Sequence, residues 1–211
     1  MLVSQRRGDQ TWRVHGNYDP PMLVRTGGKT NMAAIPSTTP ETKYVAAFLD
    51  IIGWSEGTST SPITLNEGYD IIVSGIDGKE RFSDFSQHPF ATGRPAKQIN
   101  HANPPLTSTA SGRYQFLLRT WRAYETILHL PDFSPLSQDL AVVRIIEECE
   151  ALDHIRAGEI ETAIYLCAHI WASFPKVAGG GTYTGQNAHP IATLLAQWEK
   201  IWSESEGINA A

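Results

Sequence analysis

Trp54-Ser55-Glu56-Gly57-Thr58 places a carboxylate and a glycine where an apolar helical pattern stops. The residues from 44 to 54 carry apolar side chains at 44, 45, 48, 49, 51, 52 and 54, which is typical of a broad helical face. Thr39-Pro40 supplies an N-cap residue and a proline for the first helical position. Gly57 suits the left-handed conformation in which many helices end. The pattern therefore predicts a helix whose last turn presents Glu56.

The position of Glu56 favours its protonated form. A carboxylate at the C-terminal end of a helix meets the negative pole of the helix dipole, and the neighbouring Trp54 stabilises an ionised group poorly. Both effects raise a carboxyl pKa, which suits a general acid near neutral pH. The alternative is an ordinary solvated glutamate at a helix end.

The composition indicates one globular domain. The chain has 211 residues, of which 41% are hydrophobic and 18% charged, and no apolar run is long enough to cross a bilayer. Its formal charge is −5, and residues 1–32 carry a net +3 while the remainder carries −8. An acidic body argues against nucleic-acid binding, and we also expect no stable membrane association.

No pattern in the sequence predicts a metal or another cofactor. Cys149 and Cys167 lie in apolar helical patterns, which favours buried free thiols and leaves a disulfide as the alternative. His88, His101 and His189 stand beside loop residues or prolines, and no two of them have ligand spacing on a helix.

Residues 1–40 contain four prolines and a Gly-Gly pair without periodicity, so we expect a flexible arm without a function. Met32 offers an alternative start, which would place residues 1–31 upstream of the true beginning. The domain is expected over 41–206. Arg6-Arg7 is followed by polar residues and not by an apolar core, so no secretory signal is expected.

Later segments predict a small hairpin and then a helical lobe. The hairpin is expected from strands over 69–74 and 81–85, with the turn at 75–79. A long loop over 86–110 follows, and loops of this length are often functional. Helices are expected over 114–130, from 134 to about 150, over 159–173 and from 189 through 202, with a turn at 151–157. The expected fold class is α+β, mainly helical, with one small hairpin and the helical lobe flanking a groove.

Several blocks of sequence resemble the lysozyme superfamily and, more narrowly, the lambda-phage type of endolysin. They run in the order of that family over about residues 45–205. The blocks are Phe48-Leu49-Asp50, Trp54 to Thr58, Gly68-Tyr69-Asp70-Ile71-Ile72-Val73, Phe82 to Pro89, Ser108 to Gln115, Asp132-Phe133-Ser134-Pro135 with Ser137-Gln138-Asp139, and Ile170-Trp171-Ala172-Ser173-Phe174-Pro175.

The resemblance implies a lysozyme-like fold and a peptidoglycan lytic transglycosylase. In that family one glutamate, here Glu56, protonates the leaving oxygen and then takes a proton from the C6 hydroxyl of the sugar. That hydroxyl closes a 1,6-anhydro ring, and no water is consumed. The implied partners are glycan strands, which a monomer would reach in the periplasm after a holin opens the inner membrane of the host.

Two other functions stay open on the residues alone. A muramidase would hydrolyse the same bond with a second carboxylate or a water, and Asp70 is the candidate on the facing wall. The alternative for Asp70, which we favour, is a structural aspartate bonded to nearby backbone. A non-catalytic glycan-binding phage protein is the third function, and the Glu56 motif argues against it.

Four further residues are candidates for binding the substrate. Tyr69 is suited to stack on a sugar ring or to bond the glutamate, with core packing as the alternative. Tyr114 and Gln115 are expected to begin a helix beside the groove, where an amide can bind N-acetyl and hydroxyl groups or cap backbone groups. Tyr183 lies between glycines in a segment that is either a mobile lip or a plain connection.

Arg113 is expected to pair with a nearby acid and fix its loop, and contact with a peptide stem is the alternative. Core packing is expected for most of the tryptophans in helical patterns, which are Trp54, Trp121, Trp171, Trp198 and Trp202.

Overall fold

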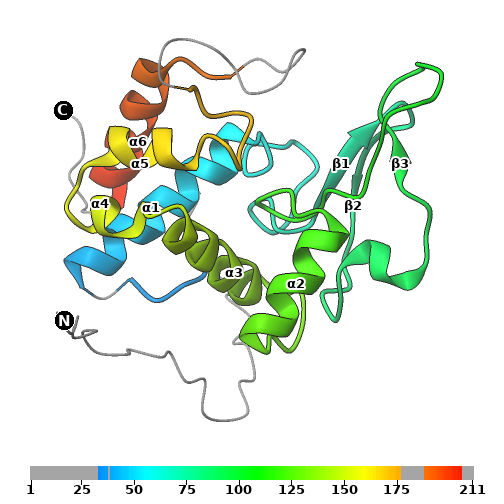
Figure 1. Ribbon diagram of the computed structural model, residues 1–211, viewed down its shortest axis with the longest axis horizontal. Coiled ribbons are helices and arrows are strands. Elements are labelled where there is room, and N and C mark those ends of the chain that lie inside the picture. Colours follow the sequence, from blue (N-terminus) through cyan, green and yellow to red (C-terminus); the bar gives the residue numbers. More distant parts are fainter. Residues whose placement is uncertain (1–32, 38, 177–187, 206–211) are drawn as a thin grey trace, which may run out of the picture.

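The computed structural model describes residues 33–37, 39–176 and 188–205. Figure 1 shows the strands gathered at one end of the molecule and most helices at the other, with α2 and α3 between them. The elements are α1 (Pro40–Ser55), β1 (Ile71–Gly75), β2 (Gly78–Arg81), the 3-10 helix η1 (Pro89–Thr92), β3 (Lys97–Gln98), β4 (Thr107–Ser108), α2 (Leu118–Leu128), α3 (Pro135–Glu148), α4 (Leu152–Arg156), α5 (Ile160–Cys167) and α6 (Ile191–Ser205). The predicted α+β class, mainly helical with a small hairpin, is confirmed.

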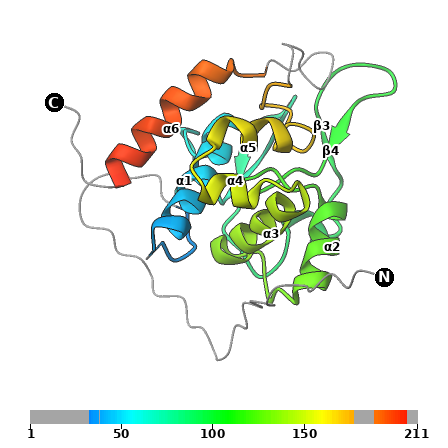
Figure 2. The same ribbon diagram turned by 60° about the vertical axis from the view of Figure 1, so that its left-hand side comes forward.

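The central element is α1, and its predicted start and end are both confirmed. Thr39 is the N-cap and exchanges hydrogen bonds with Thr42 in a capping box. The helix is buried on almost every side, and α6 and α4 pack alongside it (Figures 1 and 2). Glu56 is the C-cap residue, and Gly57 follows with a φ of 69°. Glu56 is therefore held at the C-terminal end of the buried helix.

The predicted hairpin exists, but its second strand was placed too late. Antiparallel pairing runs from Ile71 opposite Arg81 to Gly75 opposite Gly78, so the turn is only Ile76-Asp77. A second pair, β3 with β4, lies in the segment expected to be a loop. These two strands have two residues each, which is too short to leave an alternating pattern in the sequence.

Three helix predictions need correction. α2 begins at Leu118, because Ser111 and Phe116 pair through their backbones and hold residues 112–115 in a tight loop. The segment expected as a turn at 151–157 contains the short helix α4. α5 ends at Cys167, after which turns continue to Phe174. The predicted α3 and α6 are confirmed.

Residues 33–37 belong to the folded domain, so the boundary predicted at residue 40 is wrong. The amide of Ala34 donates to the Tyr69 hydroxyl at 3.1 Å, and that of Ile35 to Asp139 Oδ2 at 2.9 Å. The side chains of Ala33 and Ile35 pack against the core. Residues 1–32 of the predicted arm, Met32 included, lie outside the described residues.

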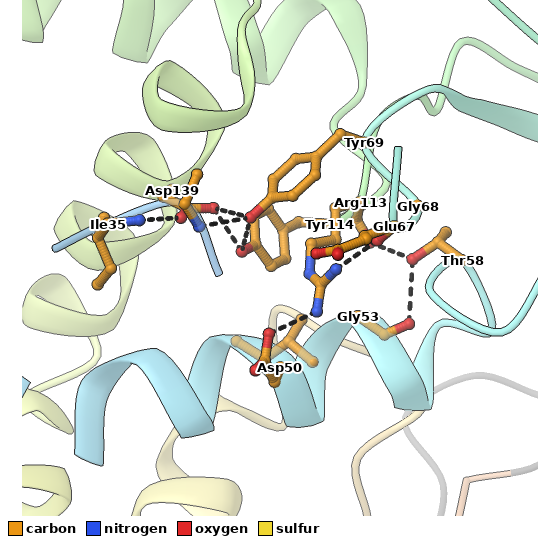
Figure 3. A network of polar contacts seen from close by, with 12 residues as sticks. Ile35, Asp50, Gly53, Thr58, Glu67, Gly68, Tyr69, Arg113, Tyr114 and Asp139 are labelled. Carbon is orange, nitrogen blue, oxygen red and sulfur yellow. Dashed lines mark hydrogen bonds and ion pairs between the residues drawn. The ribbon is translucent and has the colours of Figure 1, made fainter. Parts of the chain in front are cut away.

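A buried polar network joins the N-terminal segment to α3 (Figure 3). Asp139 is fully buried and accepts hydrogen bonds from the hydroxyls of Tyr69 at 2.8 Å and Tyr114 at 2.6 Å, in addition to the Ile35 amide. Burying a carboxyl group without hydrogen-bond partners is costly, and these three bonds offset that cost.

Arg113 extends the same network to α1 and confirms the expected pairing with an acid. Its guanidinium is fully buried, donates to Asp50 at 2.6 Å and to the carbonyl of Glu67, and lies 5.1 Å from the Tyr69 ring centroid. Thr58 Oγ1 lies 2.5 Å from the Arg113 carbonyl oxygen. Arg113 therefore fixes the loop that follows Glu56 to the loop that precedes α2.

The two cysteines are free and buried. Among the described residues, no helix has the length and apolar character needed to cross a membrane.

His88 makes the stability of the fold depend on pH. Its ring is fully buried, with Nε2 donating to the Phe116 carbonyl at 3.0 Å and Nδ1 accepting from the Phe90 amide at 3.3 Å. Burial lowers its pKa from 6.5 to about 4, so the unfolded chain binds the proton more tightly than the folded one. We expect the free energy of unfolding to fall by ~3 kcal/mol from this group as pH drops from 6.5 to 4.

Urea unfolding of the wild type and of His88→Gln between pH 7 and pH 4 measures this contribution. The variant should be less stable at pH 7 and should lose less stability toward pH 4. Parallel curves for the two proteins would show that His88 does not cause the pH dependence.

Candidate active site

A cleft of about 250 Å³ opens where α1 ends, between the loop that follows Glu56 and the hairpin. β1 forms one wall with residues 71–74, and Gly57, Thr58 and Ser61 form the opposite wall. Glu56 is the only carboxylate among the described residues that line this cleft, and Lys79 is the only cation. The remaining lining residue is Gln115.

Glu56 is held at the cleft by its backbone and by its side chain. Its amide donates to the Ile52 carbonyl at 3.0 Å, and its Oε1 accepts from Ser173 Oγ at 2.6 Å. Burial raises the pKa of the carboxyl, and the hydrogen bond from Ser173 opposes the rise. The expected direction is confirmed, with burial as its main cause, and such a carboxyl can donate a proton to a substrate oxygen.

Two residues beside Glu56 were not predicted as site residues. Ser173 lies within the turns after α5, and His189 lies just before α6. His189 Nε2 donates to the Ser55 carbonyl at 3.1 Å, and its ring packs against Trp54 at 4.9 Å between centroids. The sequence placed Ser173 in a recognisable block but gave no sign that its hydroxyl reaches a residue 117 positions away.

Tyr69 and Tyr114 are not in the cleft, which corrects their predicted role in binding substrate. Each side chain is 3% exposed, and both hydroxyls are bound to Asp139. Burial raises the pKa of both phenols, so they remain neutral donors. The alternative interpretation of Tyr69 as a core residue is confirmed.

Asp70 is also a structural residue. It is fully buried, and its two oxygens accept from Thr64 Oγ1 at 2.5 Å and from the Leu65 amide at 2.9 Å. A carboxylate enclosed in this way cannot contact a glycan, so its predicted site role is wrong and the favoured alternative is confirmed.

Gln115 lines the cleft. It belongs to the loop before α2, whereas the sequence had predicted that it begins the helix. Its backbone has a φ of 54°, and its amide Nε2 donates to the Gly112 carbonyl at 3.0 Å. A left-handed conformation at a non-glycine residue costs ~1–3 kcal/mol, and such positions cluster at functional sites. Tyr183 lies outside the described residues.

In the described part of the chain, no three side chains of His, Cys, Asp or Glu lie together as a metal site would require.

Comparisons with known proteins match this chain to endolysins. The model of the family described as Endolysin matches residues 46–204. The endolysin of Escherichia phage P2 is 53% identical over 155 residues, covering 73% of this chain and 90% of the relative. The endolysin of Escherichia phage lambda is 43% identical over 155 residues, covering 73% and 88%.

A similar fold occurs in solved structures of the lysozyme from bacteriophage lambda. One of them, in complex with a chitohexasaccharide, has a TM-score of 0.65 and 40% identity, and the match covers 79% of this chain and 97% of that one. Another has a TM-score of 0.61 and 39% identity, with coverage of 75% and 94%.

Proposed function

The chain belongs to the endolysin family, of the lambda type, and from this we propose that it cleaves the MurNAc-β-1,4-GlcNAc bond of peptidoglycan by lytic transglycosylation. The glycan as substrate is supported by the related lysozyme in complex with a chitohexasaccharide. Cleavage of the strands would weaken the wall and lyse the host cell.

One observation carries the choice of transglycosylation. Among the described residues that line the cleft, Glu56 is the only carboxylate. Glycoside hydrolases normally place a second carboxylate across the scissile bond, as nucleophile or to activate water. Asp70, the candidate for that second role, is fully buried. A site with one carboxylate suits a reaction in which the same group acts first as acid and then as base.

In the first step, protonated Glu56 gives its proton to the glycosidic oxygen. The bond from C1 of MurNAc to that oxygen breaks, the GlcNAc hydroxyl leaves, and C1 acquires oxocarbenium character. Burial raises the pKa of Glu56, which favours the acid form that donates this proton.

In the second step, the Glu56 carboxylate takes the proton of the C6 hydroxyl of the same MurNAc. The O6 atom attacks C1 and closes the 1,6-anhydro ring, which restores the protonated glutamic acid. Gln115, which also lines the cleft, is placed to bind N-acetyl or hydroxyl groups through its amide.

The compartment and the partners follow from the substrate. Peptidoglycan lies beyond the inner membrane, so an enzyme made in the host cytoplasm reaches it in the periplasm only after that membrane is opened. We propose a phage holin for that step, and a monomer as the active form.

Mass spectrometry of muropeptides released from purified Gram-negative sacculi tests the reaction type. We expect products that end in 1,6-anhydromuramic acid and are one water lighter than the products of hydrolysis. Reducing-end products would instead identify a hydrolase that uses an ordered water. Binding to sacculi without release would contradict both and identify a glycan-binding protein.

A further inference from the structure

Two serine hydroxyls stand in line behind the carboxyl of Glu56. Ser173 Oγ donates to Glu56 Oε1 at 2.6 Å, and Ser55 Oγ lies 3.0 Å from Ser173 Oγ. Ser55 Oγ also reaches the carbonyl oxygen of Ile52, at 3.0 Å. Ser55 is buried and Ser173 is half-buried, so the protein encloses much of this line.

The number of protons in this line is smaller than the number of contacts. Each serine carries one hydroxyl proton, so two protons serve three contacts. With Ser173 donating to Glu56, the proton of Ser55 has two acceptors within reach, the Ile52 carbonyl and Ser173 Oγ. It can bind only one of them well at a time, so the line has two hydrogen-bonding arrangements with the same heavy-atom positions.

The charge of Glu56 decides which arrangement is preferred. A hydrogen bond to a carboxylate is roughly twice as strong as one to a neutral acceptor. Donation from Ser55 to Ser173 polarises the Ser173 hydroxyl and strengthens its bond to the carboxylate, because hydrogen bonds in a chain are cooperative. The protonated acid gains less from this chain, and Ser55 then keeps its bond to Ile52.

We propose that Ser173 is a positioning residue for Glu56, and that Ser55 rotates its hydroxyl from Ile52 to Ser173 when Glu56 becomes a carboxylate. The inference rests on the proposed function, in which Glu56 passes through both forms in one turnover. Ser173 binds Oε1 in both forms and leaves Oε2 as the oxygen that gives and takes the proton. No proton passes along the line, since only the hydroxyl directions change.

The test compares Ser173→Thr with Ser173→Val, because these two side chains share a shape and differ in the hydroxyl. We expect Ser173→Val to lower kcat on sacculi roughly 10- to 100-fold with little change in KM, since a loosely held acid is out of position. Its activity should also extend to higher pH, because Glu56 loses the bond that opposes the rise in its pKa. Ser173→Thr should keep both kcat and the pH profile near those of the wild type.

Ser55→Ala and the double variant Ser55→Ala with Ser173→Val test the second hydroxyl. We expect Ser55→Ala to shift the pH profile in the same direction by less, and to add nothing once Ser173 is Val. Ser137→Ala, a buried serine on α3, is the matched control and should leave the pH profile unchanged.

Two results would overturn the inference. Equal pH profiles for Ser173→Val and Ser173→Thr would show that Ser173 only packs, and additive effects of the two serines would show that Ser55 acts on its own. Thermal unfolding of each variant checks that it is folded, and the Thr and Val pair remains comparable if both lose stability equally. Reducing-end products from the wild type would refute transglycosylation but not the positioning role of Ser173, because a hydrolase also needs Glu56 held as an acid.

Discussion

Glu56→Gln should lower the release of muropeptides from sacculi by a factor of ~10³ or more, since it removes both the proton that is donated and the base that recovers one. Gln has almost the same shape as Glu, and its amide oxygen can still accept from Ser173. Because burial disfavours an ionised Glu56, the neutral amide should not lower the unfolding temperature. The measurement is the initial rate of release, with a thermal unfolding curve as the test of folding.

Glu199→Gln is the matched control for that experiment. Glu199 is exposed on α6 and does not line the cleft, so its loss should leave the rate within about twofold of the wild type, as surface changes have small effects. Residual activity of Glu56→Gln above about one tenth of the wild-type rate would show that another group supplies the proton.

The second large effect is expected on stability. Arg113→Met should lower the free energy of unfolding by ~3–5 kcal/mol, because it leaves Asp50 buried without its cation. Asp139, close enough to interact electrostatically with Arg113, loses the same neighbouring positive charge. Urea unfolding at pH 7 measures the change.

Two variants separate the burial of charge from the loss of packing. Adding Asp50→Leu to Arg113→Met removes the buried acid that has lost its partner and should recover part of the lost stability. Arg94→Met removes an arginine that pairs with Glu80 at the surface, with side chains 34% and 35% exposed, and should cost ~1 kcal/mol or less. Equal losses for Arg94→Met and Arg113→Met would contradict the assignment of Arg113 as a buried anchor.

Local sequence signals predicted what depends on neighbours in the chain. The N-cap at Thr39, the end of α1 at Glu56 and the start of α3 after Ser134 all rest on residues within one helical turn, and all are confirmed. The position of Glu56 at the cleft follows from the same signals.

Local signals could not predict contacts between segments that are far apart in the sequence. Tyr69 and Tyr114 are polar aromatic residues suited to a groove, and only their bonds to Asp139, 70 and 25 residues away, show that they are buried. Ser173 approaches Glu56 across 117 residues, and no periodicity in either segment indicates this. Gln115 was assigned to a helix because the backbone pairing of Ser111 with Phe116 has no helical or strand period.

The bond between Ile35 and Asp139 has a consequence for the order in which the nascent chain folds. The two residues are 104 positions apart, so the segment before α1 cannot dock until α3 has been synthesised and has left the ribosome. Helix α1, with its many buried side chains, therefore emerges long before the partners that cover it. That apolar surface therefore stays uncovered until α3 has emerged, and closure of the domain around α1 follows the synthesis of α3.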